Sequence, residues 1–181
     1  LDQARMIKII IADDHALIRE GLRKVFSRET DIELVATAKD AYEAADFCAK
    51  YEVDVFIVDF NMPGRSGLEL IARLKALKPK LPVLVLSMMP EREVALRAFQ
   101  AGAAGFVSKE SASDEIVSAV RKVAGGARYV SPAVAEQLAQ NLASNTTDVA
   151  HDALSDRELQ VVRLIASGNR TREISEQLCL S

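Results

Sequence analysis

The sequence predicts an α/β fold in which a doubly wound, five-stranded parallel sheet is followed by a small all-α domain. Across the first 125 residues, short β-branched apolar runs alternate with segments of helical periodicity. Capping-box patterns open several helical segments, and glycines follow others. Helical periodicity then returns from Leu154, after a stretch rich in Ser, Asn and Thr.

The strands are predicted from apolar runs bounded by polar or turn residues. Parallel strands are buried on both faces, so they form continuous apolar runs instead of alternating patterns. The predicted strands cover residues 8–12, 32–38, 55–58, 83–86 and 105–107. A chain of five βα units places helices on both faces of such a sheet.

The helices between these strands follow from spacing and from their end signals. Residues 15–26 carry apolar side chains at helical spacing, and capping boxes at residues 40–43 and 66–69 open the second and third helices. A fourth helix is predicted for residues 91–101, before Gly102, and a fifth for residues 114–123, before Gly125.

The second half is predicted to be a linker followed by a helical unit. We place the first domain at residues 6–126, a linker with a helix at 132–142 in residues 127–153, and the second domain at residues 154–181. A capping box at residues 155–158 opens this domain, and another helix is predicted for residues 171–178.

Composition excludes some classes of protein. Apolar residues make up 49% of the chain, but no run approaches the roughly 20 residues that cross a bilayer. Without a signal-peptide pattern, and with two widely separated cysteines, the sequence indicates a cytoplasmic protein that does not contact a membrane. Residues 131–181 contain four arginines and seven acidic residues. This excess of negative charge argues against strong nucleic-acid binding by these 181 residues alone.

Polar side chains stand at the carboxyl ends of four predicted strands, where open α/β sheets bind their ligands. They are Asp13, Asp14, Asp59, Ser87 and Lys109. With strand order 2-1-3-4-5, the three carboxylates converge, and Mg²⁺ is the cation that suits such oxygen ligands. A carboxylate can attack phosphorus, while a metal ion, an ammonium and a hydroxyl stabilise the transferred charge.

Each of these residues also has a simpler interpretation. Asp14 could only cap the first helix, Lys109 could be a solvated surface residue, and Ser87 could be an ordinary hydroxyl at the end of a strand. Asp59 caps no obvious helix. Their joint arrangement favours the functional interpretation.

The first 125 residues resemble the flavodoxin-like receiver domain of bacterial two-component response regulators. The matching segments are Ile11-Ala-Asp-Asp-His15, Val58-Asp59-Phe-Asn-Met-Pro-Gly64, Leu86-Ser87 and Phe106-Val-Ser-Lys109. The resemblance implies that Asp59 accepts a phosphoryl group from a sensor histidine kinase. It also implies that Mg²⁺ is bound by Asp14, Asp59 and the backbone carbonyl of Asn61, with Asp13 acting through water.

The same resemblance implies a switch. Lys109 would pair with the phosphoryl group, Ser87 would turn its hydroxyl toward it, and Phe106 would rotate inward behind it. The chain departs from many receivers at Glu110, where they have a proline that follows a cis bond, and at Met88, where they have a smaller residue. A bulky Met88 could cover Asp59 and slow the attack of water.

The second half resembles the NarL/FixJ subfamily, which has a LuxR-type helix-turn-helix. The segments are Ala124-Gly-Gly-Ala-Arg-Tyr-Val-Ser-Pro132, Leu154-Ser-Asp-Arg-Glu158, Ala166-Ser-Gly168 and Thr171-Arg-Glu-Ile174. The resemblance implies that Thr171 and Arg172 contact the DNA backbone, and that the recognition helix would begin where the chain stops, at Ser181. The full-length protein would bind DNA and form a homodimer when phosphorylated.

Three other functions are less consistent with these residues. An aspartyl-phosphate hydrolase commonly needs a second acid two residues after its nucleophile, but Asn61 stands there, so we do not expect an enzyme. A flavodoxin-like cofactor binder needs a phosphate-cradling loop after the first strand, where Asp13 and Asp14 would repel phosphate. An interaction module whose C-terminal segment does not bind DNA stays open for these 181 residues.

Overall fold

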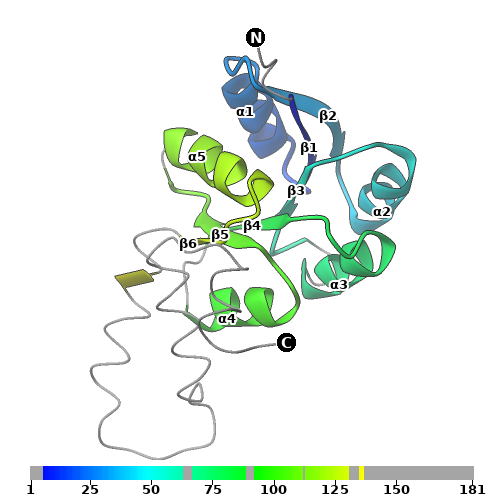
Figure 1. Cartoon of the computed structure of the whole chain (residues 1–181), viewed down its shortest axis with the longest axis vertical. Helices are drawn as coiled ribbons and strands as arrows, with labels where there is room; N and C mark the ends of the chain where they lie inside the picture. Colours follow the sequence, from blue (N-terminus) through cyan, green and yellow to red (C-terminus); the bar gives the residue numbers. More distant parts are fainter. Residues whose placement is uncertain (1–5, 63–66, 89–91, 112, 131–134, 137–181) are drawn as a thin grey trace, which may run out of the picture.

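The protein is described by a computed structural model that covers residues 6–62, 67–88, 92–111, 113–130 and 135–136 (Figure 1). Strands and helices alternate along these residues as the sequence predicts. Their order is β1 (Ile7–Ala12), α1 (Ala16–Phe26), β2 (Ile32–Ala38), α2 (Ala41–Lys50), β3 (Val55–Asp59), α3 (Gly67–Leu77), β4 (Val83–Ser87), α4 (Arg92–Gln100), β5 (Gly105–Ser108), α5 (Ser113–Ala124) and β6 (Tyr129–Val130).

The strands form one parallel sheet in the order β2-β1-β3-β4-β5-β6. The predicted order of the first five strands is therefore confirmed. The sixth strand was not predicted, because two residues are too short to show a periodicity. Tyr129 and Val130 pair with Gly105 and Phe106, so the beginning of the segment predicted as linker extends the sheet. The other domain limits stay predictions.

The sheet separates two apolar layers. In β1, Ile10 and Ala12 face the layer that contains α2, α3 and α4, whereas Ile9 and Ile11 face the layer that contains α1 and α5. This alternation follows from the two-residue period of a strand. Figure 1 shows α1 and α5 on one side of the sheet and α2 and α3 on the other. Because helices cover both faces of the sheet, a ligand can reach the strands only at their ends.

The helix ends agree with the signals in the sequence where these can be examined. Asp40 caps α2 by accepting hydrogen bonds from the backbone N–H groups of Tyr42 and Glu43, and the Glu43 carboxylate accepts one from the N–H of Lys39. The capping box is thus present, although its return bond reaches one residue before the cap. Gly102 has a φ of 101°, the left-handed conformation that glycine adopts most easily after a helix.

Several predictions fall outside the described residues. Of the helix predicted for residues 132–142, only Ala135 and Glu136 are described, and both are helical. Ser66, from the capping box predicted to open the third helix, lies outside, as do residues 143–181 and with them Thr171 and Arg172. Within the part that is described, no helix combines the length and the apolar character that a membrane span requires.

Candidate phosphoacceptor and metal site

The strand order brings the predicted acidic residues together. Asp13 directly follows β1, and Asp59 ends β3, its neighbour, in which Val58 pairs with Ala12. One ligand atom from each of Asp13, Asp14, His15 and Asp59 lies within 4.8 Å of the others. The predicted convergence of the three carboxylates at the carboxyl edge of the sheet is therefore present in the structure.

Lys109 is the cation of this cluster. Its Nζ atom lies 2.7 Å from Asp13 Oδ2 and 2.9 Å from Asp59 Oδ2, and its side chain is only 3% exposed. The alternative that Lys109 is a solvated surface residue is wrong. A buried ammonium between two buried carboxylates is positioned for a negative charge that arises at either of them.

The cluster also fits a divalent oxygen-binding cation. Three carboxylates and one ammonium leave about two negative charges in excess. Among the described residues, three carboxylate oxygens are buried and accept no hydrogen bond, namely Asp13 Oδ2, Asp14 Oδ1 and Asp59 Oδ2. Lys109 Nζ and His15 Nδ1 lie within ion-pair distance of these atoms. Buried oxygens of this kind are costly unless a cation satisfies them, and Mg²⁺ prefers such ligands.

Asp59 is held in a defined position. Burial raises the pKa of its carboxyl group, while the adjacent Lys109 ammonium and the hydrogen bond from the backbone N–H of Asn61 lower this pKa by favouring the charged form. That N–H donates to Asp59 Oδ1 over 3.1 Å, so the main chain after β3 turns back toward the carboxylate. This turn keeps Asn61 near the cluster, as a carbonyl ligand requires; its predicted coordination stays a prediction.

Asp14 is not a helix cap. The residue at the N-cap of α1 is His15, and no side chain caps this helix end. Asp13 Oδ1 accepts the backbone N–H of His15 at 2.8 Å, and Arg19 Nη1 donates to the backbone carbonyl of Asp13 at 2.7 Å. These contacts fix the turn between β1 and α1, and they leave the Asp14 carboxylate in the cluster.

The cluster also contains His15, for which the sequence alone indicates no role. Its Nδ1 atom lies 2.9 Å from Asp14 Oδ1 and 3.3 Å from Asp13 Oδ1. The available signal was its place in the chain, between a pair of acidic residues and the first turn of a helix. A single histidine at such a place is most often a surface residue, so the signal was weak.

The predicted switch residues lie at the same edge of the sheet or just below it. Ser87 ends β4, is fully buried, and its carbonyl accepts the N–H of Lys109 at 2.8 Å. Phe106 lies in β5, fully buried in the layer that contains α4. The peptide bond between Lys109 and Glu110 is trans, since the described residues include no cis bond.

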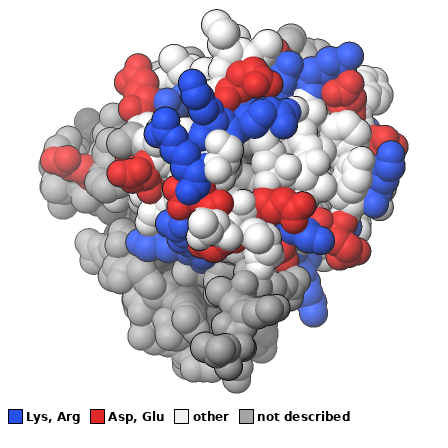
Figure 2. Space-filling view, turned by 90° about the horizontal axis from the view of Figure 1, so that it is seen from above, with Lys and Arg blue, Asp and Glu red and all other residues white. Residues whose placement is uncertain are grey.

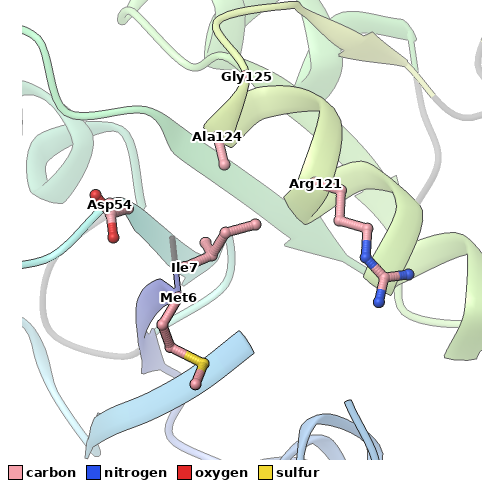
Figure 3. Close-up of a pocket in the computed structure, with 6 residues that line it drawn as sticks. All are labelled: Met6, Ile7, Asp54, Arg121, Ala124 and Gly125. Carbon is pink, nitrogen blue, oxygen red and sulfur yellow. The ribbon is translucent and has the colours of Figure 1, made fainter. Parts of the chain in front are cut away.

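A hollow lies at the edge of the sheet opposite the acidic cluster, where strands begin (Figure 3). Figure 3 shows Asp54 and Arg121 on opposite sides of it, with Ile7 between them. Asp54 accepts the N–H of Lys8, and Arg121 binds Glu29 and Asp31. Both charged side chains therefore already have partners within the fold, and the acidic cluster is the candidate site. Figure 2 shows basic and acidic side chains interspersed over one face of the molecule.

Comparisons with known proteins identify a family for each half of the chain. The family model "Response regulator receiver domain" matches residues 9–121, and "Bacterial regulatory proteins, luxR family" matches residues 152–181. The chain is 36% identical over 177 residues to the response regulator UvrY of Escherichia coli, a match that covers 97% of this chain and 81% of UvrY.

Solved structures have the same architecture. A LuxR-family two-component response regulator from Aurantimonas sp. SI85-9A1 superposes with a TM-score of 0.74 at 32% identity, which covers 76% of this chain and 99% of that one. A structure of two RcsB dimers bound to two parallel DNAs has a TM-score of 0.71 at 26% identity and covers 98% of this chain and 85% of that one.

The two matched domains define what the protein does. Receiver domains take histidine kinases as partners, and LuxR-type domains bind DNA. Their combination is that of a phosphorylation-dependent transcription regulator and not of an enzyme. The chain belongs to the two-component response regulators of the NarL/FixJ family, which join a receiver domain to a LuxR-type helix-turn-helix.

Proposed function

We propose that Asp59 is the residue of this response regulator that accepts the phosphoryl group. One observation carries the proposal: Asp59 is 1% exposed at the end of β3, yet it is held by Lys109 and by the N–H of Asn61 among other carboxylates. A buried carboxylate fixed in this way is costly for stability and is characteristic of functional sites. Asp13 and Asp14 follow β1, at the neighbouring position of the same edge.

The transfer is a substitution at phosphorus. A carboxylate oxygen of Asp59 attacks the phosphoryl group of the kinase phosphohistidine; the new O–P bond forms as the N–P bond breaks, and the histidine leaves with the bonding electron pair. The Lys109 ammonium lies close enough to Asp59 to stabilise the negative charge on the carboxylate and then on the transferred phosphoryl group.

Mg²⁺ would be held by Asp14, Asp59 and the backbone carbonyl of Asn61, with Asp13 acting through water. It would supply neutralisation of the phosphoryl charge during transfer. The excess negative charge and the buried oxygens without a hydrogen bond support this set of ligands. Asp13 also accepts the N–H of His15 and pairs with the ammonium of Lys109. These contacts suit a residue that binds the metal ion through a water molecule and not directly.

The phosphoryl group would then shift the receiver between two conformations. Ser87 ends β4, and Phe106 lies in the neighbouring β5 in register with Val85, on the side of α4. A turn of the hydroxyl and of the ring would change that side of the receiver. A homodimer that forms upon phosphorylation would match two-fold DNA half-sites, and the RcsB dimers bound to DNA support this arrangement. We propose that the protein acts in the cytoplasm. We also propose that Thr171 and Arg172 contact the DNA backbone.

The test is the intact mass of the chain after incubation with acetyl phosphate and Mg²⁺. We expect one added phosphoryl group, none in Asp59→Asn, and none when a chelator removes the metal ion. Asp46→Asn is a matched control, because Asp46 is an exposed acid of α2. If Asp59→Asn gains the group as fast as the wild type does, then Asp59 is not the acceptor.

A further inference from the structure

His15 lies in the acidic cluster, but the proposed phosphotransfer does not use it. We propose that His15 Nδ1 is a direct nitrogen ligand of the divalent ion, and that it makes the site favour ions that bind nitrogen well, such as Zn²⁺, more than an all-oxygen site would. His15 can act in this way only if the carboxylates bind a divalent ion as proposed above.

The distances within the cluster are those between ligands of one metal ion. Two neighbouring ligands at about 2.1 Å from an octahedral ion are about 3.0 Å apart, and two opposite ligands are about 4.2 Å apart. His15 Nδ1 lies 2.9 Å from Asp14 Oδ1 and 4.0 Å from Asp59 Oδ2. Both distances lie within the range that two ligands of one ion can span.

The main chain holds the imidazole at this place. The N–H of His15 donates to Asp13 Oδ1 at 2.8 Å, and its carbonyl accepts the N–H of Arg19 in the first turn of α1. Nδ1 is the ring nitrogen nearer the backbone, so the anchored main chain restricts where it can reach. The side chain is 61% exposed and approaches from solvent, whereas Lys109, at 3%, approaches from inside the fold. The two residues thus flank the carboxylates from different sides.

The chemical type of the His15 ligand determines which divalent ion binds more tightly because of it. A neutral imidazole adds a donor without changing the charge of the cluster, so the balance with a divalent ion is kept. Mg²⁺ prefers oxygen and keeps several waters, and it therefore gains little from nitrogen. Imidazole binds Zn²⁺ well, and ions of the first transition row bind nitrogen more strongly than Mg²⁺ does. Loss of His15 should therefore change selectivity more than it changes Mg²⁺ binding.

The first test uses Mn²⁺ as a paramagnetic probe on the full 181-residue chain. Pulsed electron paramagnetic resonance detects a directly bound imidazole through its ¹⁴N coupling to Mn²⁺. We expect this coupling in the wild type and its loss in His15→Ala. The chain has two histidines, so His151→Ala is the matched control and should keep the coupling. Mn²⁺ binding without ¹⁴N coupling in the wild type would overturn the role of His15.

The second test measures Zn²⁺ and Mg²⁺ dissociation constants for the same variants. We expect His15→Ala to weaken Zn²⁺ binding on the order of tenfold while Mg²⁺ binding changes by less than about twofold. Equal losses for both ions, or none, would contradict the proposal. Asp59→Asn distinguishes failure of the proposed metal site from failure of the proposed role of His15. If wild type and Asp59→Asn bind Mn²⁺ equally, the metal site itself is wrong, whatever the result for His15.

Discussion

Replacement of Gly67 by alanine tests how closely α3 packs against the turn that follows Asp59. A Cβ atom at Gly67 would lie 2.6 Å from the carbonyl oxygen and 2.8 Å from the Cα of Phe60. Both atoms belong to the main chain, so a side-chain rotation cannot relieve the contact. The N–H of Phe60 also donates to the carbonyl of Leu86 at 2.8 Å, which ties Phe60 to β4.

We expect Gly67→Ala to lower the free energy of unfolding by about 1–3 kcal/mol, the usual cost of a crowded site. Gly21→Ala is the control, since Gly21 lies exposed in α1 and its Cβ would meet no atom within 4 Å. Alanine there should stabilise the protein by about 0.5–1 kcal/mol through helix propensity.

Urea unfolding, followed by circular dichroism, measures both variants, and Mg²⁺ titration should show weaker binding in Gly67→Ala alone. The reason is that a displaced Phe60 moves the main chain between Asp59 and Asn61. If Gly67→Ala unfolds at the same urea concentration as the wild type and binds Mg²⁺ equally well, the close packing of α3 on this turn is refuted.

Three further predictions concern the metal ion, a neighbour of the site and the sixth strand. Mg²⁺ at ten times its dissociation constant should raise the free energy of unfolding by about 1.4 kcal/mol, a gain that a chelator abolishes in a thermal melt. Met88, which is 52% exposed directly after Ser87, should slow hydrolysis at Asp59; Met88→Ala should shorten the lifetime of the phosphorylated mass several-fold, and an unchanged lifetime would refute this. Burial and Glu115 raise the pKa of Tyr129 to about 12. Because the unfolded value is about 10, stability present below pH 10 should be lost as the pH rises toward 12, and Tyr129→Phe should not show this loss in unfolding measured against pH.

The sequence predicted those parts of the fold that depend on repeated signals. Each of the five longer strands contains an apolar run of several residues, and in β3 this run leads directly to the Asp59 carboxylate. The strand β6 could not be recognised: it has two residues and is defined only by pairing with β5, a contact distant in the chain. Pairing of this kind depends on the rest of the sheet and leaves no periodicity.

The site shows the same division. Asp13 and Asp59 were predictable because neighbouring parallel strands end at one edge. Whether Asp14 caps α1 was undecided from the sequence, since an acidic residue before a helix suits both roles; the turn fixed by Asp13 and Arg19 decided it. His15 was not assigned a role, because its reach toward the carboxylates depends on that same turn.

The central claim is that the phosphoryl group is attached to Asp59. Borohydride reduces an acyl phosphate to an alcohol, so a phosphorylated aspartate becomes homoserine, and peptide mass spectrometry then identifies its position. After treatment with acetyl phosphate and Mg²⁺, we predict homoserine at position 59 and unchanged aspartate at positions 13 and 14. Homoserine at position 13 or 14, with Asp59 intact, would contradict the account.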